Sequence, residues 1–216
     1  EVYTSSFREN DIAHIKNALA SDKSYLRSRL QDNLLEVRAK NIPFRDLLGL
    51  KAVQVFEIGT VFGVHEEAFH VGLAVQTGTE YKAKVDDPLL AAAVTALEAA
   101  LGVAITPVHT ASGYVEFSLE ALLPSLPVPS AYEAAQKSAA ILYKPFSAYP
   151  SVSRDIAMWV GEGTALEAVE STLRAAAAPL LVRLTHLDTF SKEGRTSLAF
   201  RLVFQSNEKT LDGAEV

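Results

Sequence analysis

The hydrophobic pattern of the last third of the chain predicts a strand, a helix and two further strands. Hydrophobic residues alternate with others along residues 197–205, and those expected on the core side are Leu198, Phe200, Leu202 and Phe204. Another strand is expected at 156–160, and residues 166–177 have apolar positions at helical spacing. Thr164 and Glu167 are spaced as a capping box at the start of that helix. HLDTF ends a further strand, and KTLDGAEV is expected to begin a second helix. This order predicts a ferredoxin-like α/β sandwich.

The first two thirds of the chain predict helices packed on a mostly antiparallel sheet, so the whole chain is of the α+β class. Apolar residues at helical spacing predict a helix over 25–40, and a second helix is expected from Asp87-Pro88 to Gly102. Four strands are expected at 51–62, 69–76, 104–109 and 114–119. A Ser112-Gly113 turn joins the last two.

A proline-rich linker divides the chain. The hydrophobic pattern of the first domain is interrupted by three prolines, Pro124, Pro127 and Pro129. The start of the last segment is flanked by Pro145 and Pro150. A connecting helix is expected over 131–142. We therefore expect two domains, 1–144 and 145–216.

The composition is that of a globular protein, and it argues weakly against a dedicated nucleic-acid binder. The 216 residues are 49% hydrophobic and 21% charged, with a net charge of −6. Residues 148–216 have seven Lys and Arg against nine Asp and Glu, whereas residues 21–51 are locally basic, with seven against four. There is no cysteine, which excludes a disulfide framework, and no apolar stretch is long enough to span a membrane. We expect a cytoplasmic protein.

Several segments resemble the beta subunit of phenylalanyl-tRNA synthetase. YPSVSRD, HLDTF and RTSLAFRLVFQSNEKTL are similar to its C-terminal anticodon-binding domain, across nearly all of 145–216. Four further segments resemble its catalytic-like domain, namely EVYTSSF, ASDKSYLRSRLQDNLLEVRAKN, LKAVQVFEIGTVF and GYVEFSLEAL. The resemblance implies a class II synthetase-like domain followed by a ferredoxin-like domain. We expect the latter to be incomplete, because this fold would need a second helix and a fourth strand after Val216.

The same resemblance implies a chain without a catalytic site of its own. A class II site needs an arginine in a Phe-Arg-x-Glu pattern, but Phe7-Arg8-Glu9-Asn10 and Phe44-Arg45-Asp46-Leu47 both lack the glutamate. No glycine-rich motif with a second arginine occurs, so nothing is left to bind a triphosphate. We therefore expect no catalytic residue, metal ligand or cofactor in this chain. ATP and magnesium would be used by the complex, through an alpha subunit in an (αβ)2 heterotetramer.

The outer face of the C-terminal sheet is the candidate site for tRNA(Phe). If Ile156, Met158 and Val160 face the helices, Trp159 faces outward, as Arg201 does on the neighbouring strand. An aromatic plane beside a cation suits unpaired RNA bases. Arg154 and Arg195, within the family-like motifs, are further candidates, although Arg154 is also expected to tie the strand to the domain body. The alternative is that Trp159 packs on the other domain and Arg201 pairs with Asp155.

Other motifs favour structural roles. His65 and His70 are five residues apart, whereas a metal site on one helical face needs four, so a solvated turn is expected. Gly161-Glu162-Gly163-Thr164 reads as a capped turn. Asp188, near His186, is expected to bond backbone amides.

The leading hypothesis is thus a non-catalytic part of phenylalanine–tRNA ligase that contributes subunit association and anticodon recognition. The alternative is a scaffold or regulatory module of the same fold that does not bind RNA.

Overall fold

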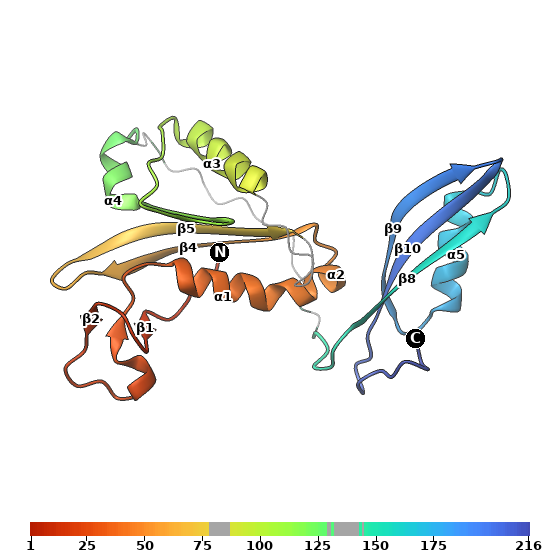
Figure 1. Cartoon of the computed structure of the whole chain (residues 1–216), viewed down its shortest axis with the longest axis horizontal. Helices are drawn as coiled ribbons and strands as arrows, with labels where there is room; N and C mark the ends of the chain where they lie inside the picture. Colours follow the sequence, from red (N-terminus) through yellow and green to blue (C-terminus); the bar gives the residue numbers. More distant parts are fainter. Residues whose placement is uncertain (78–86, 129–130, 132–142, 144) are drawn as a thin grey trace. The chain divides into compact units, whose positions relative to one another are not determined.

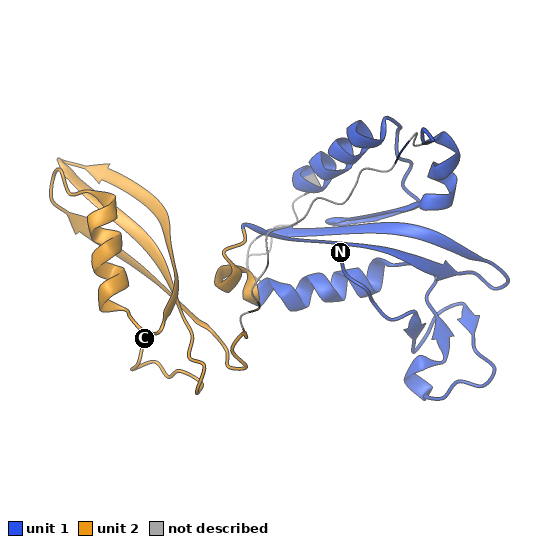
Figure 2. Ribbon diagram, turned by 180° about the vertical axis from the view of Figure 1, so that it is seen from behind, with its two compact units in different colours: residues 1–43, 51–134 blue, residues 44–50, 135–216 orange. Residues whose placement is uncertain are grey.

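A computed structural model of the chain divides it into two compact units (Figure 2). It describes all residues except 78–86, 129–130, 132–142 and 144. Unit 1 comprises 1–43 and 51–134, and unit 2 comprises 44–50 and 135–216. The connecting helix expected over 131–142 lies, apart from Ala131, outside the described residues.

Unit 1 is built on a four-stranded antiparallel sheet in the order β4-β5-β7-β6 (Figure 1). Its strands are β4 (Ala52–Phe62), β5 (Glu67–Thr77), β6 (His109–Ala111) and β7 (Tyr114–Ser118). A smaller three-stranded sheet is formed by β1 (Phe7–Arg8), β2 (Ala13–His14) and β3 (Tyr25–Leu26). The antiparallel sheet predicted from the sequence is confirmed.

Helices cover both faces of the larger sheet. Helix α1 (Gln31–Asn41) lies on one face, where Leu30 and Leu34 are fully buried. On the other face lie α3 (Asp87–Leu101) and the short α4 (Leu119–Leu122), as Figure 1 shows. The unit therefore has two hydrophobic cores, one on each side of the sheet. Among its described residues are also the 3-10 turns η1 (Ser21–Lys23) and η4 (Leu123–Ser125), and η2 (Ile42–Phe44) spans the boundary with unit 2.

Two boundaries in unit 1 differ from the prediction. The helix expected over 25–40 begins at Gln31, because Tyr25 and Leu26 pair with β1 and β2 instead. Strand pairing thus outweighs the helical spacing of the apolar residues at the start of the predicted helix. The strand expected at 104–109 is limited to His109–Ala111. Pro107 precedes it and has no N–H to donate to a ladder.

Unit 2 is a three-stranded antiparallel sheet with one helix against one of its faces (Figure 1). The sheet order is β8-β10-β9, and the helix is α5. The bounds are β8 (Val152–Val160), α5 (Leu166–Ala176), β9 (Leu181–Lys192) and β10 (Arg195–Phe204), with α2 (Arg45–Leu48) in the separate segment 44–50. The predicted core side of β10 is confirmed, since Leu198, Phe200, Leu202 and Phe204 are buried.

Two details of unit 2 correct the prediction. Thr164 and Glu167 form no capping box, because the helix begins at Leu166 with Ala165 as N-cap and without a side-chain cap. Thr164 is therefore one residue too early, and its amide instead donates to the Gly161 carbonyl in a turn. The second helix expected in KTLDGAEV is also wrong, since residues 205–216 form turns and irregular backbone, with Leu211 buried in the core.

Candidate nucleic-acid interface

The face of the unit 2 sheet opposite α5 is arranged in rows that run across the three strands. Ser197 on the central strand β10 pairs with Trp159 on β8 and with Phe190 on β9. In the next row Ala199 pairs with Ala157 and Asp188. In the third row, Arg201 pairs with Asp155 and Thr185. Because side chains alternate along a strand, all of these residues share one face.

An aromatic pair marks one end of this face. The Trp159 and Phe190 rings contact edge to face, with centroids 6.2 Å apart and planes at 69°. Both side chains are 54% exposed. Large aromatic residues of that exposure at a sheet surface offer flat apolar planes to a ligand.

Two cations lie beside the aromatic pair. A two-residue turn joins β9 to β10, and its residues Glu193 and Gly194 have φ values of 53° and 73°. Positive φ at both positions is typical of the tight hairpin turn that matches strand twist. The turn places Arg195 opposite Lys192, and both are exposed. By alternation they share the face of Ser197 and Phe190, so this end combines aromatic planes and positive charge.

Arg201 lies on the same face but is already paired. Its Nε and Nη2 atoms donate to the Asp155 carboxylate at 2.7 and 2.6 Å, and Nη1 donates to Asp46 at 3.0 Å within unit 2. The hydrogen bonds that Arg201 donates lower the pKa of Asp155, and the same bonds, accepted by Asp155 and Asp46, raise the pKa of Arg201. The structure therefore shows the pairing of Arg201 with Asp155 that the sequence left open.

Arg154 is separated from the other candidates. It lies on β8 on the same side as Ile156, two residues away, and thus on the face opposite Trp159. Its side chain is exposed, and Nη1 donates to the Ser153 carbonyl at 3.1 Å. Of the four predicted residues, the structure brings Trp159, Arg195 and Arg201 to one face and leaves Arg154 on the other.

Sequence reasoning missed Phe190 and Lys192. A register shift between Ala199 and Phe200 places Leu187 as an extra residue in β9, so alternation counted along β9 fails at that point. HLDTF therefore could not show that Phe190 shares a face with Trp159. Asp188 accepts from the Thr189 amide at 2.8 Å, but it lies within β9, which continues to Lys192, so the strand end predicted at HLDTF is wrong. His186 turns toward Phe200 on the core side.

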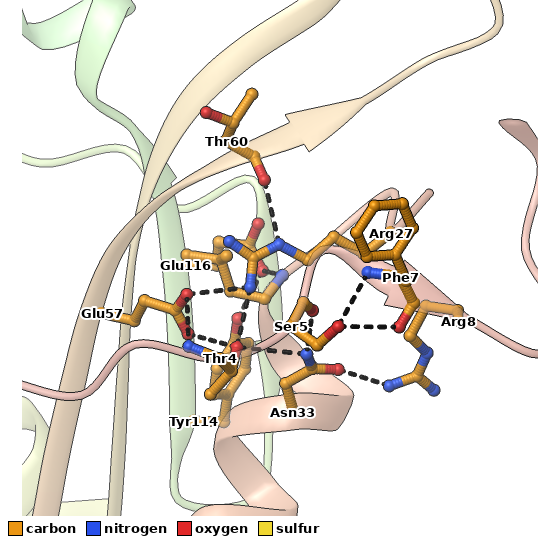
Figure 3. A network of polar contacts seen from close by, with 11 residues as sticks. Thr4, Ser5, Phe7, Arg8, Arg27, Asn33, Glu57, Thr60, Tyr114 and Glu116 are labelled. Carbon is orange, nitrogen blue, oxygen red and sulfur yellow. Dashed lines mark hydrogen bonds and ion pairs between the residues drawn. The ribbon is translucent and has the colours of Figure 1, made fainter. Parts of the chain in front are cut away.

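Unit 1 contains a second polar cluster, which is buried (Figure 3). Arg27 and Glu57 form an ion pair at 2.8 Å, with side chains 3% and 2% exposed. The guanidinium also donates to the Thr60 carbonyl and the Thr4 hydroxyl, and the Glu57 carboxylate accepts from the Thr4 amide and hydroxyl. Asn33 joins the network by donating to Thr4 and to the Ser5 carbonyl.

A second buried carboxylate, that of Glu116, lies on β7 and contacts a residue of the neighbouring strand β5. Glu116 is fully buried, and it accepts from the Tyr114 hydroxyl and from the Leu30 amide just before α1. His70 contacts its other oxygen at 2.6 Å. Burial and the adjacent carboxylate raise the pKa of Tyr114. Both clusters tie the start of the chain and α1 to the sheet, and their polar groups are satisfied internally.

The described residues contain no group of three or more His, Cys, Asp or Glu side chains positioned to hold a metal ion. Among the same residues, no helix is both long and apolar enough to cross a membrane.

Two family models match the chain. Residues 3–162 match the model described as "Phenylalanyl tRNA synthetase beta chain CLM domain", and residues 147–216 match "Ferredoxin-fold anticodon binding domain". The chain is also similar to proteins named phenylalanine–tRNA ligase beta subunit. That of Helicobacter pylori J99 is 42% identical over 81 residues, which are 37% of this chain and 11% of the relative. That of Synechococcus sp. JA-3-3Ab is 34% identical over 105 residues, or 47% of this chain and 12% of the relative. The matched segments thus span only about a tenth of these relatives.

Proposed function

The chain belongs to the phenylalanyl-tRNA synthetase beta chain family, and from this premise we propose that it contributes subunit association and tRNA(Phe) anticodon recognition to phenylalanine–tRNA ligase. The resemblance inferred from the sequence is confirmed, as is the mixed α+β architecture with an anticodon-binding domain. The single observation that supports RNA recognition is the exposed face of unit 2 that carries Trp159, Phe190 and Arg195.

The arrangement of this face suits an unpaired loop of RNA. Bases in single-stranded segments stack on aromatic side chains, and each such contact contributes about 1–3 kcal/mol. Cations beside the aromatic pair would neutralise phosphates, which makes binding dependent on salt. We assign the RNA contacts to Trp159 and Arg195. Arg201 would reach RNA only by leaving Asp155, and Arg154 would contact RNA only if the RNA extended to the other face.

We also propose that unit 1 takes part in subunit association. On β4 and β5, three apolar side chains remain exposed on the sheet face that α3 and α4 cover elsewhere, namely Phe56, Ile58 and Phe69. In this proposal the occupant of that strip is the alpha subunit. The alpha subunit would use ATP and magnesium to attach phenylalanine, in an (αβ)2 assembly. Unit 1 would keep a class II synthetase-like fold without the catalytic arginines, and we place the functional boundary between residues 144 and 145.

Anticodon recognition is tested by binding the whole chain to two tRNA(Phe) transcripts at one stated salt concentration. One transcript has its natural anticodon loop, and the other carries an unrelated loop of equal length. We expect the second transcript to bind at least about fivefold more weakly, because the base-edge contacts that distinguish one loop sequence from another would be lost. Equal affinities would refute anticodon recognition and favour a scaffold that does not read RNA.

Subunit association is tested by co-expression with a bacterial phenylalanyl-tRNA synthetase alpha subunit. We expect a complex that survives purification, and we expect Phe56→Glu to weaken it, because a charge would be buried in an apolar contact. Gln54→Glu, on the same face of β4 and already exposed, is the matched control. Absence of any complex with the unaltered chain would contradict this role.

A further inference from the structure

We propose that Trp159 and Phe190 are two independent stacking platforms, which hold two consecutive unpaired bases splayed apart from each other. This inference rests on the proposed recognition of RNA by unit 2 and names the conformation of the RNA that the site accepts. The ligand is a sharply turned single-stranded loop, as opposed to a continuously stacked strand.

The relative orientation of the two rings determines this conformation. Their planes meet at 69° and their centroids are 6.2 Å apart. A base that stacks on a ring adopts the plane of that ring, so bases on Trp159 and Phe190 would be steeply inclined to each other. Consecutive bases in a stacked strand are instead nearly parallel. One base cannot lie flat on both rings, because the rings are not parallel and contact each other directly.

The surface beside the rings leaves room for such bases. Ser197 lies between the two aromatic residues on the central strand, and the next row contributes Ala157 and Ala199. These side chains are the smallest that a strand can offer apart from glycine. Flat groups resting on the aromatic planes would therefore meet only small side chains in these two rows of the central strand.

The charges around the rings orient the RNA backbone. Arg195 and Lys192 lie at the hairpin end, beyond the aromatic row, whereas the exposed Asp188 carboxylate lies in the row on the other side. Lys192 forms an ion pair with the turn residue Glu193 at 3.7 Å, so phosphates would be attracted mainly to Arg195 and repelled by Asp188. The backbone would thus pass the hairpin end and direct its bases toward the middle of the sheet. Arg201 is not needed in this arrangement, since Asp155 and Asp46 already bind it.

The sole tryptophan of the chain makes the proposal directly measurable. A base stacked on Trp159 quenches its fluorescence, so titration with a synthetic tRNA(Phe) anticodon stem-loop reports on this ring alone. Trp159→Leu and Phe190→Leu remove one aromatic plane each while keeping an apolar side chain. We expect each variant to lose roughly 5- to 150-fold in affinity, which corresponds to one stacked base. Phe7→Leu, whose ring is 49% exposed in unit 1 and has no part in either proposed interface, is the control and should leave RNA affinity unchanged.

The double variant decides between two platforms and one. If each ring carries its own base, the double variant should bind RNA more weakly than either single variant. Because the two rings contact each other, their effects are coupled and the combined loss need not equal the product of the single losses. Quenching should also persist in Phe190→Leu once the RNA is saturating. The inference would be overturned if the double variant bound RNA as tightly as the single variant of lower affinity. It would also be overturned if saturating RNA no longer quenched the fluorescence of Phe190→Leu.

Stem-loops with one abasic nucleotide then assign each base to its ring. An abasic nucleotide at the position that stacks on Trp159 should abolish the quenching. An abasic nucleotide at the neighbouring position, which stacks on Phe190, should weaken binding of the unaltered chain but not of Phe190→Leu. If the same abasic position affected both rings, the inference would fail while anticodon recognition stood. If the unaltered chain bound stem-loops regardless of their loop sequence, the proposed function itself would fail. Trp159→Phe keeps an aromatic plane and should restore most of the affinity lost in Trp159→Leu.

Discussion

Both units place charged groups on an antiparallel sheet, but in unit 1 they are buried and in unit 2 they are exposed. The Arg27–Glu57 pair is 3% and 2% exposed, whereas Arg201 and Asp155 are 26% and 51% exposed. In the unit 1 network, the Arg27–Glu57 pair is hydrogen-bonded to Thr4 and to the Thr60 carbonyl inside the unit. The unit 2 face adds half-exposed aromatic rings and cations. The charged groups of the unit 1 sheet are therefore enclosed by the fold, whereas those of the unit 2 sheet remain accessible to a ligand.

The largest effect is expected from breaking the buried pair in unit 1. Glu57→Ala leaves Arg27 buried without its carboxylate and should destabilise unit 1 by about 3–5 kcal/mol. The double variant Arg27→Met with Glu57→Met should lose less, since neither charge then remains buried. Urea unfolding can be followed by circular dichroism for the whole chain and by Trp159 fluorescence for unit 2. An unfolding curve of Glu57→Ala that equals that of the unaltered chain would show that the pair is not structural.

In unit 2 the two faces of the sheet should respond differently. Phe200 is fully buried on the α5 side, so Phe200→Ala should destabilise unit 2 by about 3–5 kcal/mol. Trp159→Leu, on the opposite face, should change stability little and reduce RNA affinity instead. The two measurements are urea unfolding and tRNA(Phe) binding for each variant. Strong destabilisation by Trp159→Leu would mean that this ring is part of a packed surface.

The exposed ion pair should matter less than the aromatic ring. Arg201→Ala should cost about 1 kcal/mol of stability, because the pair with Asp155 is largely open to solvent and only the contact with Asp46 is partly buried. Its effect on tRNA(Phe) affinity should be smaller than that of Trp159→Leu, since Arg201 is bound to Asp155 and Asp46. Arg195→Ala, on the same strand, serves as the comparison and should weaken binding more strongly and reduce its salt dependence. A larger loss in Arg201→Ala than in Trp159→Leu would make Arg201 the main RNA contact.

The smallest effect is expected in acid. Because Arg201 lowers the pKa of Asp155 below its ordinary value of 3.8, the pair stabilises unit 2 above that pH. This contribution is lost as the pH falls below 3.8 through the lowered pKa of the folded state. The difference in unfolding midpoint between the unaltered chain and Arg201→Ala should therefore shrink between pH 5 and pH 2. A difference that stays constant over this range would show that the pair does not stabilise unit 2.

The sequence predicted the faces of unit 2 better than the ends of its elements. Alternation along β10 correctly placed Phe200 inside and Arg201 outside, because one face of that strand is committed to a core. The capping box at Thr164 was wrong, since the helix begins at Leu166 and side-chain spacing does not determine which residue is the cap. The partner of Trp159 could not be predicted either. Phe190 reaches it through a strand pairing and an extra residue at Leu187, and neither feature has a local signature.

The central claim is that RNA contacts the aromatic end of the open face of unit 2. Hydroxyl-radical footprinting tests it directly, by measuring oxidation of each aromatic side chain with and without saturating tRNA(Phe). We expect Trp159 and Phe190 to become protected, while the similarly exposed Phe69 of unit 1 stays reactive. If Trp159 and Phe190 remained as reactive in the complex as in the free chain, the RNA would bind elsewhere and this account would be wrong.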